Sequence, residues 1–295
     1  MTGGLSTTAS EEALRGRPAA AEAPVVSIVV VAHSVREDLE RCLGSIEAHA
    51  SLRVETILVD NASTDRTSEW VREAHPEVRL VELDENLGVA ARQHGMNRAT
   101  GRYTMFLDSD AELTPGALRA MVDALDEHPD WGLLGPRLVY EDGTLQLSCR
   151  RFPPLVLPLL RRPPLDRFLG ESKTVRRHLM ADVDHARARP VLYVLGACQL
   201  FRTELARKAG PVDSFIFYGP DDLDWCIRIR DAGGEIVYFP DATVVHRYRR
   251  MTRDRPLSRA ALRHLKAFLY VQWKYRRRRR ELIRLDRELD ARAVA

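Results

Sequence analysis

The sequence lacks any segment that could cross a membrane and any pattern typical of a secretion signal. Among its 295 residues, no apolar run approaches the roughly 18 residues that a membrane-spanning helix requires. The N-terminus has no charged stretch followed by an apolar one, so we expect no secretion. These absences predict a cytoplasmic protein, and peripheral attachment at the inner face of the cell membrane is a further expectation argued below.

Cysteine is scarce, and its spacing excludes the common cysteine motifs. Cys42, Cys149, Cys198 and Cys226 are far apart and contain no CxxC pair, so we expect reduced cytosolic thiols. The remaining composition, 45% hydrophobic and 29% charged, is ordinary for a soluble globular protein. The length allows one large domain or two small ones with a proper core.

The net charge is small but unevenly distributed. The whole chain carries +3, whereas residues 246–295 contain 17 Lys/Arg and 5 Asp/Glu, a net +12 that leaves −9 for the rest. A mildly acidic body joined to a strongly basic C-terminal part suggests an anionic partner for that part.

Apolar, β-branched segments alternate with segments of helical spacing in the N-terminal half. Residues 1–23 are rich in Ala, Gly, Ser and Thr and are expected to be a disordered tail. Strands are then expected at 25–34, 55–65 with its polar turn, 78–86 and 102–110, and helices at 35–50, 66–75 and 87–100, the last stopped by Gly101. This alternation predicts a parallel, doubly wound α/β sheet, which binds ligands beyond the carboxyl ends of its strands.

The C-terminal half is less regular. Residues 150–190 mix prolines, arginines and aliphatic residues, which indicates an irregular insertion that can present an apolar face. Further strands are expected at 191–202 and 235–250. A helix with an apolar stripe is expected from Pro256, continuing into the five consecutive arginines Arg276–Arg280.

Two aspartates one residue apart, Asp108 and Asp110, follow the apolar run 103–107. Residues i and i+2 of a strand share a face, so both carboxylates can point at one spot. They repel each other there unless a proton or a cation lies between them. Oxygen ligands favour Mg²⁺ or Mn²⁺, which often bridge substrate phosphates. A solvated turn after a strand is the alternative interpretation.

A second acidic cluster, Asp221, Asp222 and Asp224, follows Pro220. Acidic residues in the first turn of a helix are stabilised by the helix dipole, which is a purely structural explanation. A carboxylate at a helix start beside an aromatic such as Trp225 can also serve as the general base for a sugar hydroxyl. A third feature is His246, which ends the expected strand segment ATVVH. Its position is compatible with the same sheet edge.

Five motifs in order resemble a family 2 glycosyltransferase of the GT-A fold, of the rhamnosyltransferase-like group. They are VSIVVVAHS, ILVDNASTD, the block from ENLGVAARQ to LDSDAEL, VLGACQLFR, and the block from GPVDSFIFYGPDDLDW to ATVVH. The resemblance covers roughly residues 25–250. It implies a mainly parallel, Rossmann-like sheet with helices on both faces over residues 24–250, with an acceptor-side insertion at 150–190. For residues 251–295, the charge and the apolar stripe predict a basic, amphipathic helical region.

The resemblance also implies roles for single residues. Asp108, Asp110 and His246 would hold a Mg²⁺ or Mn²⁺ ion, and Asp222 or Asp221 would be the catalytic base. Contacts to the nucleotide-sugar are implied for Ala32, His33, Asp60, Asn61, Arg92, Asp108 and Ser109. The chain departs from the family at His33-Ser34, where Tyr-Asn is frequent, at Gln93, where Asn is frequent, and at Asp221, where Glu is usual.

The chemistry agrees with this resemblance. A nucleoside diphosphate leaves readily only if its developing charge is neutralised, which a bound cation does as a Lewis acid. A carboxylate on the opposite face of the sugar can take the proton of the acceptor hydroxyl. One direct displacement of this kind inverts the anomeric centre. The alternative is a non-catalytic nucleotide-sugar or nucleic-acid binding protein on the same fold.

The partners follow from the family and from the basic C-terminal part. The first expectation for the donor is dTDP-rhamnose, with UDP- and GDP-sugars left open, and the acceptor would be a saccharide or a polyprenyl-linked one. Arg276–Arg280 suit a solvated helix end, an anionic membrane surface contacted through 256–280, or nucleic acid. No known nucleic-acid-binding module accompanies the run, so we expect the protein not to bind nucleic acid.

Overall fold

A computed structural model describes residues 23–161, 165–247 and 258–292. The expectations for the tail at 1–22, for 248–257 including Pro256 and Leu257, and for 293–295 lie outside the described residues.

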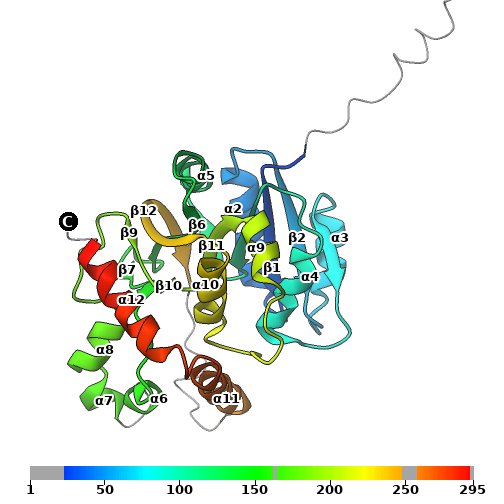
Figure 1. Cartoon of the computed structure of the whole chain (residues 1–295). Coiled ribbons are helices and arrows are strands. Elements are labelled where there is room, and N and C mark those ends of the chain that lie inside the picture. The colour runs from blue at the N-terminus through cyan, green and yellow to red at the C-terminus, as the bar shows by residue number, and fades with distance from the viewer. Residues whose placement is uncertain (1–22, 162–164, 248–257, 293–295) are drawn as a thin grey trace, which may run out of the picture.

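The centre of the protein is a ten-stranded sheet with the path β3-β2-β1-β4-β11-β6-β12-β5 (Figure 1). Two short strands lie off this path, because β7 pairs with β6 and β9 pairs with β12. The strands are β1 Val26–Ala32, β2 Val54–Asp60, β3 Arg79–Glu82, β4 Tyr103–Asp108, β5 Ala111–Leu113, β6 Trp131–Val139, β7 Leu145–Gln146, β9 Arg189–Pro190, β11 Cys198–Arg202 and β12 Glu235–His246.

Six of the ten strands in the sheet run in the same direction, as the alternation of segments predicted. The strands β3, β2, β1 and β4 are mutually parallel, and so are β6 and β12. Four strands run against this direction: β11 is antiparallel to β4 and β6, β5 and β9 are antiparallel to β12, and β7 is antiparallel to β6. Hydrophobic patterning does not record strand direction, so the sequence did not predict these reversals.

Helices cover both faces of the sheet. The side chains of β1 alternate between these two faces, and each face packs against its own set of helices. Val26, Ile28 and Val30 point into one buried cluster, whereas Val29 points into the other. The first cluster includes residues of α2, α3 and α5, and the second includes residues of α4, α9 and α10. These helices are α2 Arg36–His49, α3 Thr67–Ala74, α4 Arg92–Met96, α5 Ala117–Glu127, α9 Thr203–Ala209 and α10 Asp221–Asp231.

The helix expected at 87–100 is shorter than the prediction. A 3₁₀ turn, η1 Gly88–Ala91, leads into α4, which ends at Met96. Gly101 is therefore not a helix stop. A β-carbon at Gly101 would lie 2.7 Å from the backbone nitrogen of Ser27, so glycine is required there for the close approach of two backbones.

The described residues of the insertion at 150–190 form three short helices, α6 Leu157–Leu160, α7 Asp166–Leu169 and α8 Lys173–His178. The strand expected at 191–202 is two strands, because β10 Tyr193–Val194 pairs with β8 Cys149–Arg150 in a separate small sheet and only β11 joins the central one. Nε of Arg151 donates to Asp290 at 2.9 Å, which ties the insertion to the C-terminal helix.

Residues 258–292 of the C-terminal part form two helices, α11 Arg259–Lys274 and α12 Arg279–Arg292. The single helix predicted to run through Arg276–Arg280 is therefore wrong, because the chain turns between Tyr275 and Arg278. Val271 of α11 and Leu282 of α12 pack into the same buried cluster as α10. No helix among the described residues is long and apolar enough to span a bilayer, and all four cysteines are buried and unbridged.

Candidate active site

The carboxyl ends of three neighbouring strands bring the predicted residues to one edge of the sheet. In the parallel pairing of β1 and β2, Ala32 lies opposite Asp60. In the pairing of β1 and β4, Val31 lies opposite Asp108. Residues that are far apart in the chain thus meet where parallel α/β sheets bind their ligands.

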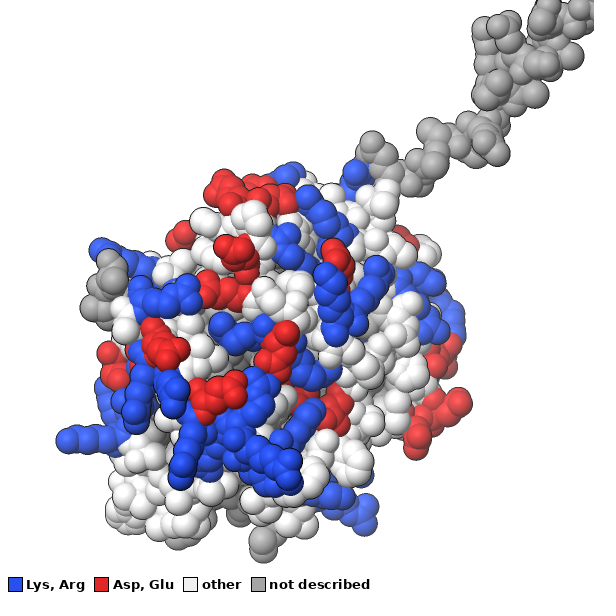
Figure 2. Space-filling model, viewed as in Figure 1, with Lys and Arg blue, Asp and Glu red and all other residues white. Residues whose placement is uncertain are grey.

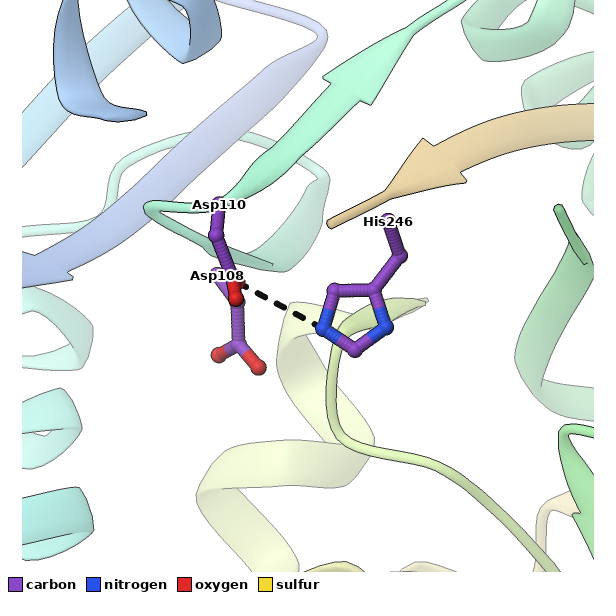
Figure 3. Close-up of side chains that lie close together, drawn as sticks. All are labelled: Asp108, Asp110 and His246. Atoms are coloured by element: carbon purple, nitrogen blue, oxygen red, sulfur yellow. Dashed lines mark ion pairs between the residues drawn. The ribbon is translucent and has the colours of Figure 1, made fainter. Parts of the chain in front are cut away.

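Asp108, Asp110 and His246 lie together at this edge (Figure 3). Asp108 ends β4, and the chain turns at once into β5, where Ala111 pairs with His246 at the end of β12. Asp110 therefore lies in the turn rather than in the strand. One ligand atom from each of the three side chains lies within 4.8 Å of the others. Two carboxylates and one imidazole are a suitable donor set for Mn²⁺ or Mg²⁺.

The position of the His246 ring is set by a residue that sequence reasoning missed. Nδ1 of His246 donates to Oε1 of the buried Gln146 at 2.6 Å. Nε2 is then the nitrogen that faces Asp110, 3.4 Å from its Oδ1. A hydrogen bond at one ring nitrogen commonly fixes which nitrogen is presented to a metal. Gln146 belongs to the short strand β7, and no motif in the sequence marks it.

The charges of this cluster shift the pKa values of its members. Burial would lower the pKa of His246, but the hydrogen bond and charge of Asp110, with the charge of Asp108, outweigh it and raise the pKa. Burial raises the pKa of Asp108, and the charge of Asp110 adds to the rise, although Arg92 opposes it. Like charges crowded at one point create a site that a cation would stabilise.

Arg92 connects the two acidic clusters. Its guanidinium is buried, and Nη2 donates to Oδ1 of Asp108 at 2.6 Å while Nη1 donates to Oδ2 of Asp221 at 2.8 Å. Nη2 also donates to the carbonyl of Gly196 at 3.0 Å, and the ring of Phe106 lies 5.1 Å from the guanidinium carbon. The family resemblance implied a contact of Arg92 with the nucleotide-sugar, but not that Arg92 joins Asp108 to Asp221.

Asp221 and Asp222 begin α10, immediately after Pro220. Burial raises the pKa of Asp222 to about 7, and the neighbouring charge of Asp221 adds to this rise. The backbone N–H of Leu223 and the charges of Arg150 and Arg92 act in the opposite direction. A carboxyl group that titrates near neutral pH can both accept and release a proton under ordinary conditions.

The residues predicted to contact the nucleotide have structural partners of their own. Oδ1 of Asp60 accepts from the backbone N–H of Ser63 at 2.9 Å, and Oδ2 accepts from the hydroxyl of Ser68. Each carboxylate oxygen has a further lone pair for a ligand. The exposed ring of His33 bonds through Nδ1 to the carbonyl of Asn61 at 2.8 Å. Ala32 is buried, and Ser109 is half-buried in the turn between Asp108 and Asp110.

Asn61 is a bridge between two loops. Its Nδ2 donates to the carbonyl of Gly88 at 3.1 Å, and its Oδ1 accepts from the backbone N–H of Leu87 at 2.8 Å. The side chain thus fixes the 83–88 loop against the end of β2. Its nucleotide contact stays a prediction.

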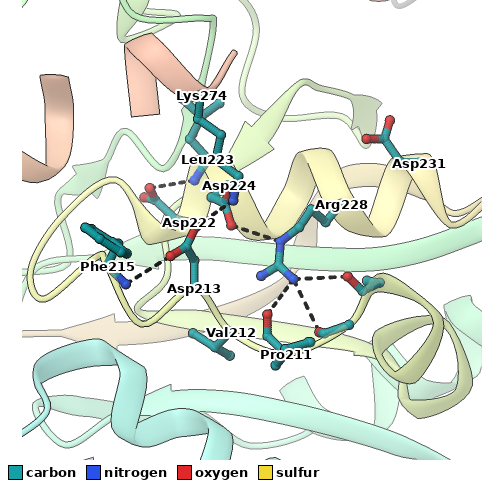
Figure 4. A network of polar contacts seen from close by, with 12 residues as sticks. Pro211, Val212, Asp213, Phe215, Asp222, Leu223, Asp224, Arg228, Asp231 and Lys274 are labelled. Atoms are coloured by element: carbon teal, nitrogen blue, oxygen red, sulfur yellow. Dashed lines mark hydrogen bonds and ion pairs between the residues drawn. The ribbon is translucent and has the colours of Figure 1, made fainter. Parts of the chain in front are cut away.

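The third acidic residue of the downstream cluster, Asp224, lies in a buried network (Figure 4). It accepts from Nε of Arg228 at 2.9 Å and from the hydroxyl of Tyr275 at 2.8 Å, and it pairs with Lys274 at 2.5 Å. Asp224 therefore joins α10 to α11. Trp225 is also buried, stacked edge-on to Phe201, so it is a core residue and not a surface for a sugar.

Comparison with known proteins places these features in a family. The family described as "Glycosyl transferase family 2" matches residues 27–210, which is more than half of the chain. The N-acetylglucosaminyl-diphospho-decaprenol L-rhamnosyltransferase of Mycobacterium tuberculosis is 27% identical over 259 residues, covering 84% of each chain. The succinoglycan biosynthesis protein ExoO of Rhizobium meliloti is 37% identical over 111 residues, covering 37% of this chain and 32% of its own.

Solved structures show the same architecture. GalNAc-T7 with UDP, GalNAc and Mn²⁺ superposes with a TM-score of 0.60 at 18% identity, over 85% of this chain and 48% of its own. The mannosyltransferase PcManGT from Pyrobaculum calidifontis, in complex with GDP-Man and Mn²⁺, superposes with a TM-score of 0.54 at 23% identity, over 82% of this chain and 64% of its own. The likeness shows the fold, which is the GT-A arrangement that the sequence predicted.

Proposed function

Because the chain belongs to glycosyl transferase family 2, we propose that it is an inverting, metal-dependent glycosyltransferase of cell-envelope polysaccharide synthesis. It would move a sugar from a nucleotide-diphosphate donor to a hydroxyl of a saccharide or lipid-linked acceptor. The relative from M. tuberculosis and the succinoglycan biosynthesis protein support the cell-envelope setting through their names. We also propose the division into a catalytic domain at 24–250 and a basic helical region at 251–295.

One observation carries the proposal. Arg92 spans from Asp108, in the candidate metal cluster, to Asp221, beside Asp222. The group that would hold the leaving diphosphate and the group that would take the acceptor proton are thus separated by one buried side chain. A single displacement requires both groups at one anomeric carbon.

The residues divide the reaction between them. A divalent cation held by Asp108, Asp110 and His246 would neutralise the charge that develops on the departing diphosphate. Asp222 would accept the proton of the attacking hydroxyl, which is worth roughly 10²–10⁴ in rate. Arg92 holds Asp108 and Asp221 in place. One displacement without a covalent sugar intermediate inverts the anomeric centre.

The proposed donor is dTDP-rhamnose, and the proposed acceptor is a polyprenyl-linked saccharide. Support for both comes from the relative, whose name specifies L-rhamnosyl transfer to N-acetylglucosaminyl-diphospho-decaprenol. UDP- and GDP-linked sugars are the alternatives, since the structural neighbours were solved with UDP and with GDP-Man. A polyprenyl-linked acceptor also favours peripheral attachment at the inner face of the cell membrane through residues 256–280.

Calorimetric titration of dTDP, UDP and GDP, with and without Mn²⁺, tests the proposal. We expect one nucleotide to bind in a Mn²⁺-dependent manner to the wild type. The dependence on Mn²⁺ should be lost in Asp110→Ala. It should persist in a control, Asp123→Ala, which removes an exposed carboxylate of α5.

The outcomes separate the candidate functions. The nucleotide that binds names the donor class. Binding of a sugar nucleotide without turnover of any saccharide acceptor would favour a non-catalytic sugar-nucleotide binder on this fold. Failure of all three nucleotides to bind under any condition would reject the transferase.

A further inference from the structure

The large apolar side chains that are exposed to solvent gather in one part of the described chain. Nine such side chains are exposed, and none belongs to a strand of the sheet or to α2, α3, α5, α9, α10 or α12. They come from the insertion, from the loop before α10 and from α11. We call them the apolar surface: Leu155, Val156, Leu159, Phe168, Leu169, Phe215, Leu262, Leu269 and Trp273.

These segments are neighbours in space. Leu157 of α6, Val175 of α8 and Phe268 of α11 form a small buried cluster of their own. Phe215 stacks on Tyr270 of α11, with ring centres 5.1 Å apart, and Tyr270 stacks in turn on Trp273. Figure 1 shows α6, α7 and α11 together at one end of the molecule, the lower end in that view.

The same end is strongly cationic. Residues 258–280 contain nine Lys/Arg and no Asp/Glu. Arg259, Arg263 and Lys266 on α11, and Arg276, Arg277 and Arg280 after it, are exposed. Figure 2 shows Lys and Arg side chains clustered just above the lower end of the molecule.

We propose that the apolar surface and its arginine border form a docking site for an anionic lipid bilayer. Apolar side chains enter the boundary between headgroups and acyl chains, while neighbouring cations attract anionic headgroups. Tyr270 and Trp273 are the amphipathic rings that favour this boundary. The inference rests partly on the proposed function, since a polyprenyl-linked acceptor resides in a membrane.

The charge pattern favours lipid over other occupants. A second copy of the chain would bring two copies of residues 258–280 together, a segment that contains no carboxylate to compensate its cations. This like-charge contact opposes a symmetric dimer. A nucleic acid would contact the cations but would leave the exposed Leu, Phe and Trp side chains without a partner. Only a surface that is both anionic and apolar satisfies both parts of the site.

The docking site is joined to the catalytic helix. Lys274 and Tyr275, at the end of α11, both contact Asp224 of α10. Lys274 also contacts Asp213, at 2.6 Å, in the loop that carries Phe215. Asp221 and Asp222 begin the same helix α10, so the base is fixed relative to the lipid-facing side chains.

Vesicle binding by the full chain tests the inference. The probes are vesicles of phosphatidylcholine alone and of phosphatidylcholine with phosphatidylglycerol, measured by co-sedimentation. We expect binding only to the anionic vesicles, and a loss of roughly tenfold or more in affinity for Leu269→Glu combined with Trp273→Glu. Trp273→Phe, which keeps an aromatic ring, should bind like the wild type.

Two further measurements test which side chains contact the bilayer. Lipids with brominated acyl chains should quench tryptophan fluorescence of the wild type, and much less that of Trp273→Phe. Arg276→Glu with Arg277→Glu should weaken binding, whereas Arg119→Glu, an exposed change on α5 at the opposite end of the molecule (Figure 1), should not.

Nucleotide binding by the same variants separates this inference from the proposed function. Variants that lose vesicle binding should keep the affinity of the wild type for the donor nucleotide. Equal binding of wild type and Leu269→Glu/Trp273→Glu to anionic vesicles would overturn the docking site while leaving the transferase intact. A wild-type dimer that these changes dissociate, without any vesicle binding, would assign the apolar surface to a second copy instead.

Discussion

The Nδ1 atom of His246 donates a hydrogen bond to the Oε1 atom of Gln146 over 2.6 Å. The two residues are a hundred positions apart in the chain and meet because β7 pairs with β6, which in turn pairs with β12. The hydrogen bond leaves Nε2 of His246 facing Asp110 and Asp108. Gln146 thus determines which nitrogen can act as a ligand.

The first prediction is that Gln146 controls metal affinity. Gln146→Met keeps the length of the side chain but removes the acceptor, and should weaken Mn²⁺ binding by about 10- to 100-fold. Gln146→Glu keeps an acceptor and should bind Mn²⁺ nearly as well as the wild type. Titration of Mn²⁺ followed by electron paramagnetic resonance measures both, and equal affinities of wild type and Gln146→Met would contradict the role.

The second prediction concerns pH. The pKa of Asp222 is about 7, and a general base acts in its deprotonated form. We therefore expect kcat/KM to rise about tenfold per pH unit below 7 and to level off above it. Asp222→Asn should lower kcat by roughly 10²–10⁴ and abolish this limb of the profile. If Asp221→Asn abolishes the limb instead, Asp221 is the base.

The third prediction is that the charge of Arg92 lowers the pKa of the proposed base, Asp222. The charge of Arg92 lowers the pKa of Asp222 against the effects of burial and Asp221. Arg92→Met removes this charge, so the midpoint of the pH profile should move upward by roughly one unit. Arg92→Lys keeps the charge but cannot bind Asp108 and Asp221 through two separate nitrogens, and it should shift the midpoint of the pH profile less. An unchanged midpoint in Arg92→Met would show that its charge does not reach Asp222.

The fourth prediction separates a structural aspartate from the functional ones. Asp224 is 1% exposed and pairs with Arg228 and Lys274. Asp224→Ala leaves these cations without their partner and should lower the free energy of unfolding by about 3 kcal/mol. Asp231→Ala, on the same helix but exposed, should cost roughly 1 kcal/mol or less. Urea titration measures both changes, and equal costs would contradict the buried network.

From the sequence, the residues at the carboxyl edge of the sheet could be predicted better than their arrangement relative to one another. Continuous apolar runs ending in Asp60 and Asp108 are typical of buried parallel strands, and the structure places both ends at the same edge of the sheet, on either side of β1. The gathering of Asp108, Asp110 and His246 came from the family resemblance, because spacing alone cannot show that β12 returns beside β5. Their roles as ligands, and that of Asp222 as base, stay predictions.

Other features depend on tertiary contacts that no local pattern records. The arginine run has good helix propensity, yet the chain turns there because Val271 of α11 and Leu282 of α12 pack into one core from two different helices. Trp225 has the spacing of an aromatic beside a carboxylate, but Phe106 and Phe201 enclose it. The bridge from Asp108 through Arg92 to Asp221 could not be predicted either, because it depends on how α4 and α10 are placed relative to β4.

The contacts of Lys274 with Asp213 and Asp224 also bear on how the reaction rate depends on the acceptor. A catalytic helix held rigidly to a bilayer would meet a lipid-linked acceptor within a thin layer and not throughout the solution. The effective concentration of the acceptor in that layer exceeds its bulk value. The rate would then follow the number of acceptor molecules per lipid, so that adding inert lipid slows the reaction even when the amounts of enzyme and acceptor are unchanged.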